Sequence, residues 1–194
     1  MRDVTDIERR RRIGRDLGDP PYSPQQLATL IDDVPDFPKK GILFKDITTL
    51  LKDARAFRQS IDQLTERVRA HVPSVVIGME SRGFIFAAPI AYKLDAGFVP
   101  VRKLGKLPGE VISTEYDLEY GTNTLELHSD AIAAGDRVLI VDDLLATGGT
   151  VSATIELVER LEGKVAAVAF LVELTDLNGR DRLRDYEVIS LIQF

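Results

Sequence analysis

Two adjacent carboxylates, Asp142 and Asp143, stand just before a run of small residues. The run is Ala146, Thr147, Gly148, Gly149 and Thr150. Small side chains leave backbone N–H groups open to an anion, and a helix that starts there adds the positive end of its dipole. No Lys precedes Thr150, so the run is not a Walker loop. The pattern indicates a binding site for a phosphate monoester beside two acids.

Acids beside a phosphate site suit a ligand that carries hydroxyl groups next to its phosphate. A ribose 5-phosphate fits, because Asp142 and Asp143 can accept hydrogen bonds from both ribose hydroxyls. A lone Gly-Gly-Thr is more often an ordinary turn between a strand and a helix. The full run of apolar strand, paired acids, small-residue turn and helix is far more specific.

The elements around this turn can be predicted from the apolar pattern. Residues 138–141 form an unalternating β-branched run, which is typical of a parallel strand buried on both faces. Apolar residues recur at helical spacing from Val151 to Leu161, and Gly163 is expected to end that helix in the left-handed conformation. The acids then lie at the carboxyl end of a strand, where open α/β sheets place ligands.

A second turn has a similar setting. Glu80, Ser81, Arg82 and Gly83 stand between the apolar run 75–79 and an apolar helix pattern over 84–94. Such a turn alone is equally consistent with an ordinary connection that carries a solvated Arg. In a chain that already has one predicted phosphate site, an anion-binding role for this turn is more strongly indicated, because the guanidinium fork of Arg82 can bind two oxygens of a diphosphate.

The segment 102–109 interleaves basic residues with Gly and Pro. Alone, such a segment is usually a mobile surface loop. Here we expect a lid, because a ribosyl cation would be captured by water in an open site. Lys103 and Lys106 could neutralise pyrophosphate, either in the same subunit or in a partner.

Length and composition limit the remaining possibilities. The chain has 194 residues, of which 44% are hydrophobic and 29% charged, as in a soluble globular protein. A net charge of −6 argues against a general nucleic-acid binder. There are no cysteines, which excludes disulfides and thiolate metal sites, and no apolar run approaches the roughly 18 residues that span a bilayer. We therefore expect a cytoplasmic protein with no membrane contact, with residues 1–22 as a polar, Arg-rich arm.

Four motifs together resemble a known family. The run from Arg137 to Thr150 resembles the phosphoribosyl pyrophosphate signature of the type I phosphoribosyltransferases, and Gly78–Phe86 resembles their pyrophosphate loop. Leu144-Leu145 and the segment 37–48 resemble the adenine-specific members. The resemblance implies an α/β fold in which helices flank a mostly parallel central sheet. It also implies a single domain over 23–194, with an N-terminal hood at about 34–50 and a lid hairpin at about 102–127.

In that family the backbone of the hood reads the Watson–Crick edge of adenine, and an aromatic residue stacks on the ring. The matching positions are Leu43, Phe44 and Lys45. A carbonyl accepts from the exocyclic amine and a neighbouring N–H donates to a ring nitrogen. A 6-oxo purine presents the opposite pattern and would leave buried groups unpaired.

The pattern Tyr-x-Leu-Glu-Tyr-Gly, which ends at Gly121, resembles the family's lid. The resemblance places Glu119 at the base, as a general base for the imidazole proton of adenine, with Tyr120 beside it. We expect two strands, residues 113–121 and 124–128, joined by a hairpin around Gly121–Asn123.

The resemblance implies that adenine and phosphoribosyl pyrophosphate give AMP and pyrophosphate, as in purine salvage. It also implies a homodimer and Mg²⁺ held mainly by substrate and water. Two alternatives stay open. One is a phosphoribosyltransferase for hypoxanthine, guanine, orotate or uracil. The other is a non-catalytic regulator that senses phosphoribosyl pyrophosphate and binds DNA through the Arg-rich arm, against which stand the acidic balance and the intact lid.

Overall fold

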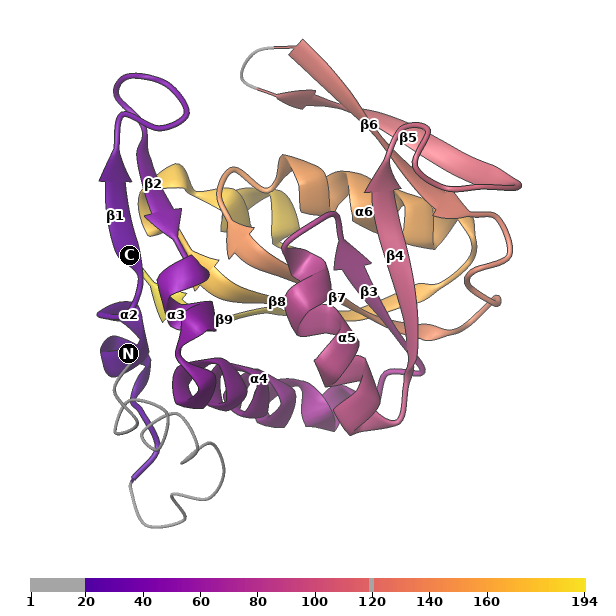
Figure 1. Cartoon of the computed structure of the whole chain (residues 1–194). Helices are drawn as coiled ribbons and strands as arrows, with labels where there is room; N and C mark the ends of the chain where they lie inside the picture. The colour runs from indigo at the N-terminus through magenta and orange to yellow at the C-terminus, as the bar shows by residue number, and fades with distance from the viewer. Residues whose placement is uncertain (1–19, 119–120) are drawn as a thin grey trace, which may run out of the picture. The chain divides into compact units, whose positions relative to one another are not determined.

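The computed structural model describes residues 20–118 and 121–194, drawn in colour in Figure 1. Its internal contacts divide the chain into two compact units, Met1–Gln59 and Ser60–Phe194. The first unit includes the predicted hood, and the second includes both predicted phosphate-binding turns and the lid. The predicted single domain over 23–194 stays a prediction.

The first unit contains short helices and a two-stranded sheet. These are α2 (Pro24–Ala28), β1 (Asp32–Pro35), β2 (Leu43–Asp46) and α3 (Thr48–Lys52). Ser23 begins α2 with a capping box, because its Oγ accepts from the N–H of Gln26 and its own N–H donates to Oε1 of Gln26. β1 and β2 pair antiparallel with Val34 opposite Phe44.

The helix α4 (Ala54–Val68) follows α3 and begins at an acidic cap. Oδ1 of Asp53 accepts from the N–H groups of Arg55 and Ala56, at 2.9 and 2.8 Å. These are two of the N–H groups that have no partner within the helix.

The second unit is built on one sheet of seven strands, in the order β5-β6-β4-β3-β7-β8-β9. The strands are β3 (Val75–Met79), β4 (Gly97–Lys103), β5 (Val111–Leu118), β6 (Gly121–His128), β7 (Arg137–Leu145), β8 (Lys164–Glu173) and β9 (Val188–Gln193). The helices are α5 (Gly83–Leu94) and α6 (Gly149–Arg160), with the 3₁₀ turns η1 (Arg69–His71), η2 (Thr175–Leu177) and η3 (Gly179–Leu183). The neighbouring strands β4, β3, β7, β8 and β9 pair parallel to one another. β6 pairs antiparallel with both β4 and β5. The sheet is therefore mostly parallel, as predicted.

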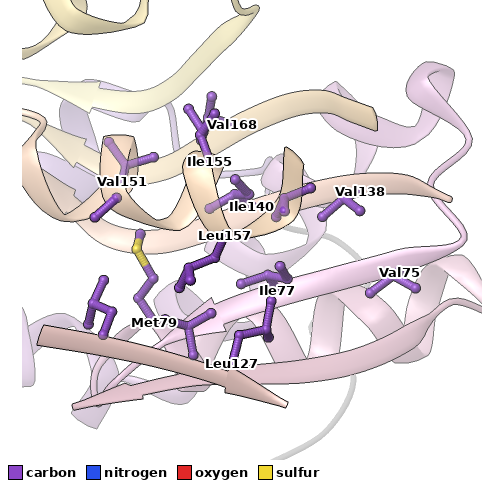
Figure 2. Packing of buried hydrophobic residues seen from close by; sticks show 14 of the residues in the cluster. Val75, Ile77, Met79, Leu127, Val138, Ile140, Val151, Ile155, Leu157 and Val168 are labelled. Carbon is purple, nitrogen blue, oxygen red and sulfur yellow. The ribbon is translucent and has the colours of Figure 1, made fainter. Parts of the chain in front are cut away.

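The helices α5 and α6 cover opposite faces of the sheet. Ile77 and Met79 of β3 belong to the apolar cluster that Val151 and Ile155 of α6 complete (Figure 2). Gly78, between them, faces the other way, because a Cβ there would lie 2.8 Å from Cβ of Ala87 in α5. Strands buried on both faces explain the unalternating apolar runs. No helix of the described residues is long and apolar enough to span a membrane.

Three predicted boundaries were wrong. β7 continues past Val141 to Leu145, since its residues keep pairing with β8 as far as Leu145 opposite Glu173. β6 begins at Gly121, which pairs with Leu118, so residues 121–123 belong to the strand. The left-handed residue after α6 is Glu162 (φ 61°) and not Gly163. Gly163 is needed for close packing, since a Cβ there would lie 2.9 Å from Ile132 and from Val158.

Candidate active site

A pocket lies where β7 passes into α6. It is lined by Asp142, residues 144–151 and Phe170, which faces Asp142 from β8. The strand brings the acids and the turn to the carboxyl edge of the sheet. The helix contributes its first N–H groups, which have no partner within α6. The predicted residues Asp142, Leu144 and Ala146–Thr150 therefore line one pocket.

Glycine is required at the tightest point of the turn. Gly148 is the N-cap of α6 and has φ 82°, a left-handed conformation that disfavours a side chain. A Cβ at this position would also lie 2.8 Å from the carbonyl oxygen of Gly179. The turn therefore keeps its backbone uncovered on the pocket side and packs closely against η3 behind it.

The two acids lie in different surroundings. Asp143 is buried, and its Oδ2 lies 2.8 Å from Nε of Arg82. Among the described residues this oxygen has no hydrogen bond of good geometry. Asp142 is half-buried and its Oδ1 accepts from the backbone N–H of Asp143 at 2.8 Å. The pair retains capacity to accept hydrogen bonds from a ligand.

Burial makes these acids weaker than ordinary carboxyl groups. Desolvation raises the pKa of Asp142 well above its usual range, and the neighbouring charge of Asp143 raises it further. Desolvation also raises the pKa of Asp143, although the cation of Arg82 offsets part of the effect. Ligand hydroxyls that donate to the pair would stabilise its charged form.

The second predicted turn lies directly against the first. Gly83 begins α5, and a Cβ there would lie 2.7 Å from Oδ1 of Asp142 and 3.0 Å from the carbonyl oxygen of Val141. The ion pair between Arg82 and Asp143 joins the same two turns. Ser81 is exposed at the surface of its turn. Arg82, which is predicted to bind the diphosphate, thus adjoins the acids that are predicted to bind ribose.

The basic lid segment is anchored at its base to the second turn. Glu80 accepts from Nε and Nη2 of Arg102, both at 3.3 Å, and from the N–H of Lys103 at 3.1 Å. Desolvation acts to raise the pKa of Glu80, but these hydrogen bonds outweigh it and the pKa is lowered. Nη1 of Arg102 donates to the carbonyl of Lys106. The side chains of Lys103 and Lys106 are exposed, and the structure does not bring them to the pocket.

The base of the hairpin rests on α6 through polar contacts. Oγ1 of Thr114 donates to Glu156 at 2.8 Å, and Nη1 of Arg160 donates to the carbonyl of Ser113 at 2.7 Å. Oγ1 of Thr150, in the turn after β7, donates weakly to the hydroxyl of Tyr116 at 3.4 Å. Glu119 and Tyr120 lie outside the described residues.

Comparison with known proteins identifies the family. The model of the phosphoribosyl transferase domain matches residues 48–194. An adenine phosphoribosyltransferase of Synechococcus is 57% identical over 168 residues, which are 87% of this chain and 98% of the relative. The crystal structure of the Thermoanaerobacter pseudethanolicus enzyme has a TM-score of 0.86 at 55% identity, covering 89% of this chain and all of the other. That of the Saccharomyces cerevisiae enzyme, complexed with an imino-altritol bisphosphate and adenine, has a TM-score of 0.83 at 40% identity, covering 87% and 98%.

The chain belongs to the adenine phosphoribosyltransferase family. This confirms the family, the type I phosphoribosyltransferase fold and the enzyme class predicted from the sequence. The roles of the individual residues stay predictions.

The predicted hood residues of this phosphoribosyltransferase lie on β2 of the first unit. The ring of Phe44 packs edge-to-face on Phe37, with centroids 5.1 Å apart. Nζ of Lys45 lies 2.6 Å from Asp33, so its charge has a partner on β1. The side chain of Leu43 is half exposed. These contacts order the strand whose backbone is predicted to read adenine.

Sequence reasoning missed several residues that support the site. Gly83 carries the contact between the two turns, Glu80 anchors the predicted lid segment, and Gly179 lies behind the turn after β7. The glycine directly after Arg82 indicated that another part of the chain packs closely against the backbone there, but the sequence does not identify that part. The role of Glu80 depends on the pairing of β3 with β4, which is a tertiary feature.

The Gly83→Ala variant of this phosphoribosyltransferase is expected to lose about 100-fold in kcat/KM for phosphoribosyl pyrophosphate, since its methyl group would displace the carboxylate of Asp142. Steady-state kinetics would measure this loss. Gly97→Ala is the matched control, because a Cβ there meets nothing closer than 3.7 Å. Equal kinetics for both variants would contradict the contact.

Proposed function

We propose that the protein transfers the 5-phosphoribosyl group from phosphoribosyl pyrophosphate to adenine, giving AMP and pyrophosphate in purine salvage. The observation that carries this proposal is the 57% identity to an adenine phosphoribosyltransferase over 98% of that relative's length. The bond from C1 of the ribose to the pyrophosphate oxygen breaks, and a bond from C1 to an imidazole nitrogen of adenine forms.

The turn after β7 would bind the 5-phosphate. Residues 146–150 offer backbone N–H groups at the start of α6, and the hydroxyls of Thr147 and Thr150 can donate as well. The left-handed Gly148 supports this role, since a side chain there would collide with the carbonyl oxygen of Gly179 behind the turn.

The two acids would bind the ribose hydroxyls and stabilise positive charge on the ring. Bond breaking at C1 gives the ring oxocarbenium character, and negative charge fixed nearby lowers the barrier. The raised pKa of Asp142 shows how weakly its charge is solvated. In the transition state the same poor solvation strengthens its attraction for the cationic ring.

Mg²⁺ would be held at this site mainly by substrate and water. Asp143 retains acceptor capacity that could bind the metal's water ligands. When bound, Mg²⁺ would neutralise charge on the departing pyrophosphate.

The pyrophosphate would be bound from the β3–α5 turn and the lid segment. Arg82 lies half-exposed on Asp143, so its guanidinium could bind diphosphate oxygens while it stays beside the ribose site. Ser81, Lys103 and Lys106 are exposed donors on the same turn and on the segment that Glu80 anchors.

Glu119 would accept the imidazole proton of adenine as the other ring nitrogen attacks C1. Tyr120 would lie beside the base. The backbone of Leu43–Lys45 would select adenine over 6-oxo purines, with Phe44 on the ring. A homodimer, expected from the family resemblance, and a cytoplasmic location, expected from the composition, remain proposals. Light scattering would measure the oligomeric state.

The proposed function is tested by incubating the protein with phosphoribosyl pyrophosphate, Mg²⁺ and one base at a time. We expect AMP from adenine, and turnover at least about 1,000-fold lower with hypoxanthine or guanine, since a mismatched hydrogen-bond pattern is rejected by about 10⁴–10⁵ in the best cases. Orotate and uracil should give no nucleotide. Nucleotide formed from another base, with none from adenine, would refute the assignment.

A further inference from the structure

The proposed reaction leaves unused a charge cluster around the buried Glu173, at the carboxyl end of β8. Glu173 is 4% exposed and accepts hydrogen bonds from three side chains. Arg180 donates through Nε at 2.6 Å and through Nη2 at 2.8 Å, Ser190 at 2.6 Å and Gln193 at 3.1 Å. Desolvation acts to raise the pKa of Glu173, but the hydrogen bonds outweigh it and lower the pKa to about 2. The cluster therefore stays charged at any working pH.

This cluster lies beside the start of the phosphate turn. Glu173 is paired with Leu145, the last residue of β7, and the N–H of Leu174 donates to the carbonyl of Leu145 at 2.9 Å. The turn and the cluster are therefore neighbouring strand ends in one sheet.

Arg180 follows Gly179, which lies directly behind the turn. A Cβ on Gly179 would collide with the carbonyl oxygen of Ala146, and its own carbonyl limits Gly148 from the other side. Arg180 also donates through Nη1 to the carbonyl of Val188 at 3.0 Å. Through these bonds Glu173 and β9 hold the first residue of η3 in place.

We propose that Glu173 and Arg180 form a positioning pair, which fixes Gly179 behind residues 146–148 and so holds the backbone N–H groups of the phosphate turn in their binding geometry. The inference rests on the proposed function, because it assigns the turn to the 5-phosphate. Loss of the pair should therefore have a selective effect. It should weaken the binding of ligands that contact the turn through a 5-phosphate, and it should leave the binding of other ligands unchanged.

Direct binding of separate ligands tests this selectivity. By calorimetry, Arg180→Ala is expected to lower the affinity for ribose 5-phosphate about tenfold and to change the affinity for pyrophosphate by no more than about twofold. The reason is that a small misplacement of the turn affects only the ligand groups that contact it. Arg180→Lys keeps the charge and loses the guanidinium fork. Its affinity for ribose 5-phosphate should lie between those of the wild type and Arg180→Ala. In kinetics, KM for phosphoribosyl pyrophosphate should rise while KM for adenine stays unchanged.

Arg184→Ala is the matched control. Arg184 follows Arg180 by four residues and pairs with Asp181 at 3.0 Å, and both side chains of this pair are largely exposed. It should bind both ligands as the wild type does. Should Arg180→Ala not fold, Arg180→Lys supplies the test, since it keeps the charge and loses only the fork that binds both oxygens of Glu173.

Two results would overturn the proposal. One is unchanged affinity of both Arg180 variants for ribose 5-phosphate. The other is equal weakening of ribose 5-phosphate and pyrophosphate with a lower melting temperature, which is what a merely structural pair would give. Failure of the proposed function is distinguishable, because it would appear in the wild type as absence of AMP formation.

Discussion

The Asp142→Asn variant is expected to be more stable than the wild-type protein at pH 7 and to lose about 100- to 1,000-fold in kcat. Burial, and then the charge of Asp143, raise the pKa of Asp142, so holding this residue ionised in the fold is unfavourable. Asn has the same shape, carries no charge and can still accept from the N–H of Asp143. We expect a gain of about 1 kcal/mol in the free energy of unfolding, typical of an active site that gives up stability for activity.

The pH dependence gives the sign of this effect. A carboxyl whose pKa is raised by folding contributes stability at low pH and loses that contribution as the pH rises through its folded-state pKa. The two proteins should therefore have similar stability below the ordinary value of 3.8 and diverge as the pH rises, with the variant more stable.

Urea unfolding of the two proteins between pH 4 and pH 8 would measure this divergence. Asp143→Asn is the matched comparison and should gain less, because Arg82 already offsets part of the desolvation at Asp143. An Asp142→Asn protein that is less stable than the wild type at pH 7, or that keeps full turnover, would contradict the role given to this acid.

Glu119→Ala is expected to lower kcat by about 10²- to 10⁴-fold, the usual contribution of a general base. KM for adenine and for phosphoribosyl pyrophosphate should change much less, because a proton acceptor acts mainly in the transition state.

Steady-state kinetics from pH 5 to pH 9 would test this prediction. Glu115→Ala is a close control, because Glu115 is an exposed acid of β5 and precedes Glu119 by four residues in the sequence. It should behave as the wild type. Turnover of Glu119→Ala equal to that of the wild type would remove Glu119 from the mechanism. A rise in KM for adenine at constant kcat would make it only a residue that orients the base.

The parts of the site that are local in sequence could be predicted from sequence. The acids, the small-residue turn and the start of α6 lie within about a dozen consecutive residues, so their chemistry and spacing are visible without a fold. The family motifs added the order of the segments. Even there β7 was predicted too short, because only its pairing with β8 shows that Leu144 and Leu145 still belong to the strand.

The parts that depend on strand order could not be predicted. Gly83 contacts Asp142 because β3 and β7 are neighbours in the sheet, although the two residues are far apart in sequence. Glu173 lies beside the phosphate turn because β8 follows β7 in the same sheet. Gly163 shows that the reason for a single glycine cannot be predicted from the sequence, since glycine is needed there for packing space and not for its φ angle.

The most direct test of the account is a crystal structure of the protein with phosphoribosyl pyrophosphate and Mg²⁺. We expect the 5-phosphate on the backbone N–H groups of residues 146–150, the ribose hydroxyls on Asp142 and Asp143, and the diphosphate beside Arg82. A saturated crystal in which the turn after β7 holds no phosphate, or in which neither acid contacts a ribose hydroxyl, would contradict it.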